Sequence, residues 1–101
     1  MLCAHTVRRL KPGSFHAFTE AFPDDPPAGW VRFHALRGIA DPDEVVTFGF
    51  FDGTLAELER SQEASGYREL RDRIDPLVEA VVANGIYEIA ISREARPALA
   101  G

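Results

Sequence analysis

The hydrophobic pattern of the chain is most pronounced at Glu44–Phe51, which reads Glu-Val-Val-Thr-Phe-Gly-Phe-Phe. β-Branched and aromatic residues favour strands, and successive side chains of a strand point to opposite faces. One face would hold Val46, Phe48 and Phe50, and the other Val45, Thr47, Gly49 and Phe51. A strand with one solvated face would carry polar residues at every second position. The pattern therefore predicts a strand covered on both sides, by helices on one side and by a second subunit on the other.

Three further segments have the composition of strands, and one short segment has the period of a helix. The predicted strands are Leu2–Leu10, Trp30–Arg37 and Ile86–Ser92. Phe15, Phe18 and Phe22 recur at helical spacing after Ser14, so a helix is expected from Phe15 to Ala21. The prolines and Gly29 of the segment 23–29 end this helix and predict a rigid loop.

Most of the predicted helix lies in the second half of the chain. Thr54-Leu55-Ala56-Glu57 matches a capping box, which starts a helix that runs to about Ala64. From Tyr67 to Val82 the apolar residues follow a helical period, with a kink or restart at Asp75-Pro76 and an end at Asn84-Gly85. The residues from 93 to 101 are expected to form a flexible C-terminal tail.

The predicted order β-α-β-β-α-β defines the fold class. It is that of an α+β, ferredoxin-like domain over residues 1–92, a four-stranded antiparallel sheet with helices on one face. The uncovered face of such a sheet agrees with the two apolar faces of the strand 44–51. We therefore expect a homodimer closed through the open sheet face.

Folding the hairpin of strands 30–37 and 44–51 symmetrically about Ala40 and Asp41 predicts which side chains share a face. Val31, Phe33 and Ala35 would lie opposite Phe50, Phe48 and Val46. On the other face, Trp30, Arg32, His34 and Leu36 would lie opposite Phe51, Gly49, Thr47 and Val45. Because this register separates an apolar face from a mixed one, it is favoured over a one-residue slip. The missing side chain of Gly49 would leave a gap beside Arg32, which is one way for a pocket to arise.

Composition and charge limit the possible partners of the 101-residue chain. A formal net charge of −5 argues against nucleic acid, whose phosphates require a basic surface. No window approaches the ~20 apolar residues of a membrane span. Cys3 is the only cysteine, which fits a reducing, cytoplasmic compartment. No Cys or His pairs have the spacing of a zinc site, and no Gly-rich phosphate loop is present.

The candidate site residues come from the mixed face of the hairpin and from the long helix. His34 and His5 are candidate catalytic bases, because imidazole titrates near neutral pH, although each could equally be a structural histidine of a sheet. The candidate substrate-binding residues are Arg32, Trp30, Gly49, Phe51, Tyr67 and Arg71. Arg32 would hold an acidic or phenolate group or form an ion pair between subunits, and Tyr67 and Arg71 lie one turn apart.

The run from Asp41 to Asp52, then a helix, Ser65-Gly66-Tyr67-Arg68 and Pro76-Leu77, resembles the dimeric α+β barrel proteins. Among them it is most similar to the antibiotic-biosynthesis-monooxygenase-like group, over roughly residues 2 to 92. The resemblance implies a homodimer with a small-molecule cavity between the sheet and helices of each subunit. It also implies a monooxygenase that needs no cofactor and acts on phenolic, quinol or enolic substrates.

Two functions therefore stay open at this point. In the first, His34 or His5 takes a proton from a small aromatic or enolic ligand, and Arg32 holds the anion that reacts with dioxygen. In the second, the dimer binds a ligand or has a structural role without catalysis. Many members of the group carry an acidic residue where this chain has Gly49 and a histidine near the position of Arg60. These two departures favour the second function.

Overall fold

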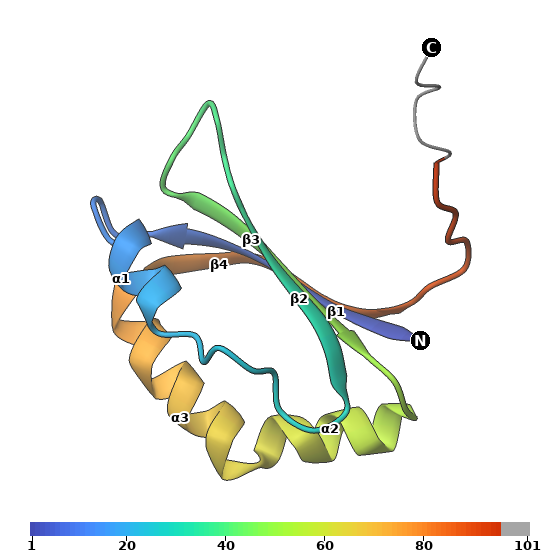
Figure 1. Cartoon of the computed structure of the whole chain (residues 1–101). Helices are drawn as coiled ribbons and strands as arrows, with labels where there is room; N and C mark the ends of the chain where they lie inside the picture. The colour runs from blue at the N-terminus through green and yellow to red at the C-terminus, as the bar shows by residue number, and fades with distance from the viewer. Residues whose placement is uncertain (96–101) are drawn as a thin grey trace.

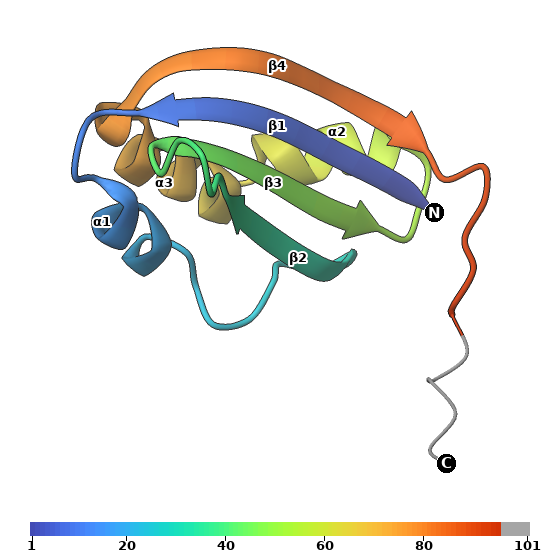
Figure 2. The same ribbon diagram turned by 90° about the horizontal axis from the view of Figure 1, so that it is seen from above.

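Four antiparallel strands form one sheet in the order β2-β3-β1-β4, and the helices lie on one side of it (Figures 1 and 2). The computed structural model describes residues 1–95. The strands are β1 (Leu2–Leu10), β2 (Trp30–Arg37), β3 (Glu44–Phe51) and β4 (Val78–Glu88). The helices are α1 (Phe15–Glu20), α2 (Leu55–Glu63), α3 (Ser65–Ile74) and the 3₁₀ turn η1 (Asp75–Leu77). The predicted ferredoxin-like α+β fold is confirmed.

The hydrophobic core lies between the helix-covered face of the sheet and helices α1 and α3. Leu10, Phe18, Val45 and Ile74 pack together there and are essentially inaccessible to solvent. Along β3 every second residue is buried, from Val45 to Phe51, as a pleated strand with one covered face requires. The alternate residues Val46, Phe48 and Phe50 face the other side of the sheet and are only partly buried. This second face, called here the open face, has no cover from the described residues of the same chain.

The second half of the chain corrects the predicted long helix. The predicted helix agrees with α3 as far as Ile74, but its continuation to Asn84-Gly85 is wrong, because β4 begins at Val78. Pro76 cannot donate a backbone hydrogen bond and clashes with the preceding turn, so it ends the helix. The predicted last strand, Ile86–Ser92, begins eight residues too late and ends four too late, and Asn84-Gly85 lies inside β4.

The reason for this error is the irregular pairing of β4 with β1. The register shifts twice, between Val7 and Arg8 and between Arg9 and Leu10. Each shift leaves one residue of β4 without an opposite partner, so the apolar residues no longer alternate strictly. The interrupted alternation resembled a helical period in the sequence. Residues 93–95 have no regular secondary structure, and the rest of the predicted tail lies outside the described residues.

The predicted register of the β2–β3 hairpin is also wrong, by one residue over most of its length. Trp30 lies opposite Phe51 as predicted, but Arg32 pairs with Phe50 and Phe33 with Gly49. An irregularity between Trp30 and Arg32 gives β2 one extra residue, which has the form of a β-bulge. The bulge turns the side chains that follow it to the opposite face, which changes the candidate site.

The capping box of α2 gives a test of the local structure. Thr54 Oγ1 accepts a hydrogen bond from the Glu57 backbone N–H at 3.2 Å, and Glu57 Oε1 accepts one from the Thr54 N–H at 3.1 Å. We expect Thr54→Ala to lower the free energy of unfolding by about 1 kcal/mol in urea titrations at fixed protein concentration. Ser14 is the matched control, because it stands at the N-cap of α1 without a side-chain capping bond.

The same motif gives the pH dependence of this effect. Hydrogen bonds from the backbone and side chain of Thr54 lower the pKa of the Glu57 carboxyl. The stabilisation is therefore complete above the unfolded pKa of about 4.3 and is lost as the pH falls through the lower folded pKa. The stability difference between Thr54→Ala and the unmodified protein should shrink in that acidic range. Equal losses for Thr54→Ala and Ser14→Ala would contradict the capping assignment.

Candidate functional site

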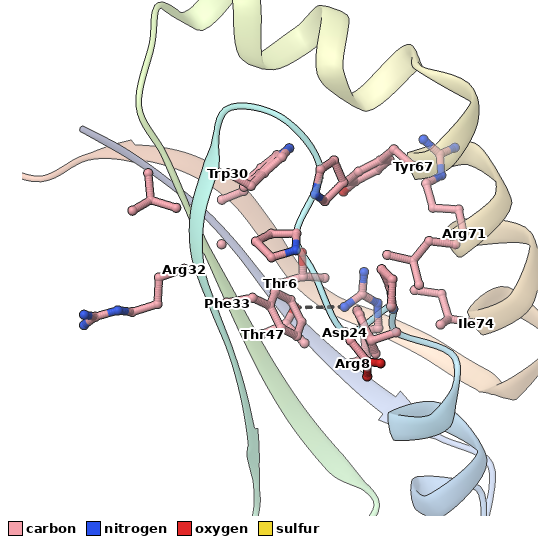
Figure 3. Close-up of a pocket in the computed structure, with 18 residues that line it drawn as sticks. Thr6, Arg8, Asp24, Trp30, Arg32, Phe33, Thr47, Tyr67, Arg71 and Ile74 are labelled. Atoms are coloured by element: carbon pink, nitrogen blue, oxygen red, sulfur yellow. Dashed lines mark hydrogen bonds between the residues drawn. The ribbon is translucent and has the colours of Figure 1, made fainter.

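A pocket of about 310 Å³ lies between the helix-covered face of the sheet, helix α3 and the loop 23–29 (Figure 3). Its walls combine residues of β1, β2 and β3 with residues of α3 and of that proline-rich loop. The residues that matter for its chemistry are Thr6, Arg8, Phe22, Asp24, Trp30, Phe33, Thr47, Gly49, Tyr67 and Arg71. The pocket is therefore built from residues of a single chain.

Trp30 and Tyr67 form one aromatic wall of the pocket. Their rings are nearly parallel, with centroids 6.3 Å apart and an interplanar angle of 19°. The indole also contacts the buried Phe51 edge to face, at 5.2 Å between centroids. Trp30 Nε1 donates a hydrogen bond of 2.7 Å to Ser61 Oγ on α2. These contacts fix the indole plane, which is what a rigid ligand wall requires.

Gly49 is the residue that allows Trp30 to lie across β3. A Cβ atom at position 49 would lie 2.6 Å from Cζ3 of the indole, which is closer than any van der Waals contact. The space expected at Gly49 is therefore present, but the Trp30 ring occupies it. Gly49 shapes the pocket by positioning a neighbour and not by leaving a gap for a ligand.

Phe22 and Phe33 form a second aromatic wall. Their rings pack at 4.7 Å between centroids with an angle of 31°, and Phe22 contacts the core residue Phe18 at 5.1 Å. Phe33 reaches this side of the sheet because the bulge in β2 turns it toward the helices. The pocket thus has aromatic surfaces from two separate parts of the chain.

Arg8 of β1 provides a positive charge in the pocket. Its Nη1 donates a hydrogen bond of 3.0 Å to Thr47 Oγ1, and its guanidinium lies 6.0 Å from the centroid of the Phe18 ring. Burial lowers the pKa of Arg8, and the nearby Tyr67 and Asp75 act in the opposite direction. An arginine remains protonated despite such a shift. The charge is therefore permanent and held in a defined place (Figure 3).

Several of the residues predicted for the site are brought together by the structure. Trp30, Gly49, Tyr67 and Arg71 line the pocket, and Phe51 supports Trp30 from its buried side. Arg32 borders the pocket with its backbone, while its side chain points away from it (Figure 3).

The two histidines do not lie where the predicted hairpin register would put them. His34 pairs with Phe48 and shares the open face with Phe50, whose ring centroid is 6.3 Å from that of His34. His5 lies on the same face, with its ring 4.9 Å from that of Phe48. The predicted pairing of Arg32 with Gly49 and of His34 with Thr47 is therefore wrong. The bulge between Trp30 and Arg32 is the physical reason.

Sequence reasoning missed Arg8, which is the most distinctive polar group of the pocket. Alternation along β1 places Arg8 on the same face as Leu10, which is fully buried. The other face of β1 is equally apolar, with Cys3 and Val7, so the pattern alone does not show which of the two faces the helices cover. Burial raises the pKa of the Cys3 thiol, which does not favour a role as a nucleophile.

Metal-binding groups and membrane-spanning helices were also considered among the described residues. Among residues 1–95, no group of three or more His, Cys, Asp and Glu side chains is arranged to hold a metal ion. Over the same range, no helix is both long and apolar enough to cross a membrane.

The contact between Gly49 and Trp30 can be tested by one added methyl group. We expect Gly49→Ala to displace the indole and to destabilise the protein by about 1–3 kcal/mol, as overpacking does. The fluorescence of Trp30, the only tryptophan, should shift in the folded variant. Gly66→Ala is the control, because a Cβ there meets no atom within 4 Å and alanine favours the helix. An unchanged spectrum and stability of Gly49→Ala would contradict this packing.

Comparison with solved structures shows the same fold in proteins of low sequence identity. An antibiotic-biosynthesis-monooxygenase-like protein from Nitrosomonas europaea matches with a TM-score of 0.74 and 21% identity, over 90% of this chain and 100% of its own. One from Chloroflexus aurantiacus matches with a TM-score of 0.78 and 14% identity, over 92% and 96%. A NIPSNAP domain protein from Burkholderia xenovorans matches with a TM-score of 0.67 and 17% identity, over 93% and 100%.

No protein-family model and no curated protein matches the sequence. At these identities the structural likeness establishes the fold and not the activity. The chain therefore has the ferredoxin-like α+β fold of the antibiotic-biosynthesis-monooxygenase-like proteins, as the resemblance of its sequence predicts.

Proposed function

We propose that the chain forms a homodimer through its open face and that each subunit binds a planar aromatic small molecule in its pocket. The observation that carries this proposal is the pair of aromatic walls, Trp30–Tyr67 and Phe22–Phe33, around one hollow. Ligand pockets are mostly apolar with a few placed polar groups, and their volumes run from roughly 300 to 1,000 Å³. The pocket fits this description at its small end, which suits a ligand of one or two rings.

The apolar character of the open face is the argument for the proposed dimer. Cys3, His5 and Val7 of β1 lie beside Val46, Phe48 and Phe50 of β3, and all are at most partly buried by their own chain. Leu36 and Tyr87 on the flanking strands are 50% and 57% exposed. A continuous apolar surface of this kind on a sheet is characteristic of an association site. A second copy of the same face is the partner that the proposal requires.

The proposed activity is that of a cofactor-independent monooxygenase acting on a phenolic, quinol or enolic compound. The supporting observations are the fold shared with the monooxygenase-like proteins and the Arg8 charge inside an aromatic pocket. Such chemistry needs the substrate as an anion, which a nearby cation stabilises in a poorly hydrated site. The guanidinium would thus favour ionisation of the bound hydroxyl, whose proton would pass to water. The anion would supply the electrons that reduce dioxygen, with one oxygen atom entering the quinone product and the other leaving as water.

Binding without catalysis is the second candidate function, and one observation favours it. No histidine is among the described residues that line the pocket, so neither His34 nor His5 is placed to take a proton from a ligand there. A catalytic role for either histidine would have to act from the open face. Oxygen consumption with hydroxylated naphthalenes separates the two functions, because a binding protein would bind them and consume none.

Obstruction of the pocket tests where the ligand binds. Thr6 lies in the pocket at the middle of β1, and Thr6→Phe should abolish binding of naphthalene derivatives measured by quenching of Trp30 fluorescence. Ile39→Phe is the control, because Ile39 is fully exposed on the β2–β3 turn and should leave affinity unchanged. Circular dichroism verifies that both variants fold. His34→Ala should also leave binding unchanged, whereas a fall in turnover of about 100-fold would assign it a catalytic role.

A charge placed on the open face tests the dimer. We expect Phe48→Glu to abolish association, because a carboxylate buried without a partner would oppose contact between two apolar sheets. Analytical ultracentrifugation at micromolar concentration should show a dimer for the unmodified protein and none for the variant. Leu55→Glu is the matched control, since Leu55 is half exposed on helix α2, on the other side of the sheet. A monomeric unmodified protein would contradict the proposal.

A further inference from the structure

Arg8 has more hydrogen-bond donors than its surroundings use. A guanidinium carries five N–H donors, and one nitrogen of Arg8 donates to Thr47 Oγ1. The ion pairs within residues 1–95 are Arg9–Asp41 and His16–Glu20, so no described carboxylate pairs with Arg8. Asp75 acts on Arg8 electrostatically without forming an ion pair with it, so the half-buried guanidinium has no direct carboxylate contact among the described residues.

The unused donors of Arg8 are accessible from the pocket. In the described part of the chain, every fully buried side-chain nitrogen or oxygen has a hydrogen-bond partner. A nitrogen of Arg8 without a partner must therefore be reachable by solvent, and Arg8 lines the pocket. Thr47, which is only 6% exposed, and the Phe18 ring hold the guanidinium in place, so a ligand would meet donors that are already oriented.

The other charged groups of the pocket would influence the orientation of a bound molecule. Asp24 lines the pocket from the loop 23–29 and is exposed, and Arg71 lines it from an exposed position on α3. A negative group would be repelled by the Asp24 carboxylate and attracted to both arginines. Arg8 is half-buried and held by its hydrogen bond to Thr47, whereas Arg71 is exposed to solvent, which screens its charge. The two aromatic walls would enclose the flat, apolar part of the same molecule.

We infer that the ligand is an aromatic acid, whose single anionic oxygen group, a carboxylate or an ionised phenol or enol, binds the Arg8 guanidinium. The inference rests on the proposed small-molecule pocket and adds the charge class of its ligand. Guanidinium and carboxylate form short, charge-assisted hydrogen bonds, frequently two in parallel, which fix orientation as well as affinity. Arg8 is thus a binding residue that selects anionic over neutral ligands of the same shape.

The test compares one pair of ligands that differ in charge and hardly in shape, the naphthoate and its amide, and adds a bulkier ionised phenol. Binding of 2-naphthoate, its neutral amide 2-naphthamide and the ionised phenol of 2,4-dinitro-1-naphthol is measured by calorimetry with the full chain at pH 7. We expect the naphthoate or the ionised naphthol to bind at least about tenfold more tightly than the amide. Tighter binding of the naphthoate assigns a carboxylate ligand, and tighter binding of the naphthol assigns a phenolate.

Substitutions of Arg8 test whether this residue causes the preference for anionic ligands. Arg8→Met should weaken binding of the preferred anion by about 10- to 100-fold and leave the amide unchanged. Arg9→Met is the matched control, because it removes the same charge from the adjacent residue, which pairs with Asp41 on the outside of the pocket. Loss of a half-buried charge without a counter-ion should not unfold the protein, which urea titration verifies. Arg8→Lys, which keeps the charge, should retain part of the preference and serves if Arg8→Met does not fold.

The results distinguish a failure of the proposed ligand pocket from a failure of the proposed anionic ligand. If none of the three compounds binds to the unmodified protein, the proposed ligand pocket itself is wrong. If the amide binds as tightly as the anions, or if Arg8→Met and Arg8→Lys leave the preference unchanged, the pocket stands and the charge assignment is overturned. An equal loss in Arg9→Met would mean that the overall charge of the protein, and not Arg8, attracts the anion.

Discussion

The sheet of this protein has large apolar side chains on both faces, while the helices of the chain cover only one. Val45 and Phe51 are buried beneath the helices, but Val46, Phe48 and Phe50 between them face outward. Full burial of such a side chain contributes roughly 1.5–3 kcal/mol, so the open face leaves a substantial stabilisation unused in a single chain. Because the helices cover only one of the two apolar faces, the pocket lies on one side of the sheet and an uncovered apolar face lies on the other. The two faces therefore suit the two proposed tasks, ligand binding on the covered face and association on the open face.

A single extra residue in β2 decides which side chains reach the pocket. Without the irregularity between Trp30 and Arg32, the strand would present Arg32 and His34 to the helices and Phe33 to the open face. The bulge reverses this arrangement but leaves Trp30 in place against Gly49. The edge strand therefore supplies the rings of Trp30 and Phe33, and the half-buried charge of the pocket comes from Arg8 on the central strand β1. Bulges near sites commonly re-aim side chains in this way.

The sequence allowed prediction of the elements whose signals are local. The strands 2–10, 30–37 and 44–51 and the α2 capping box depend on composition and short-range hydrogen bonds, and their bounds agree with the structure. β4 was misread because two register shifts disturb its alternation. The faces of β2 could not be predicted, since a bulge has no reliable signature in one strand. Arg8 was missed because the choice between the two faces of β1 depends on which one the helices cover.

The position of Arg8 changes what kind of chemistry the pocket can support. The histidines lie on the open face, so the pocket contains no imidazole among its described residues. A guanidinium held by Thr47 and Phe18 in an aromatic pocket would instead stabilise an anion that the proposed ligand already carries or forms on binding. Burial removes water from the Arg8 guanidinium, which costs free energy. A bound anionic ligand would offset part of this cost. Any oxygenation in such a site would depend on the acidity of the substrate and not on a strong protein base.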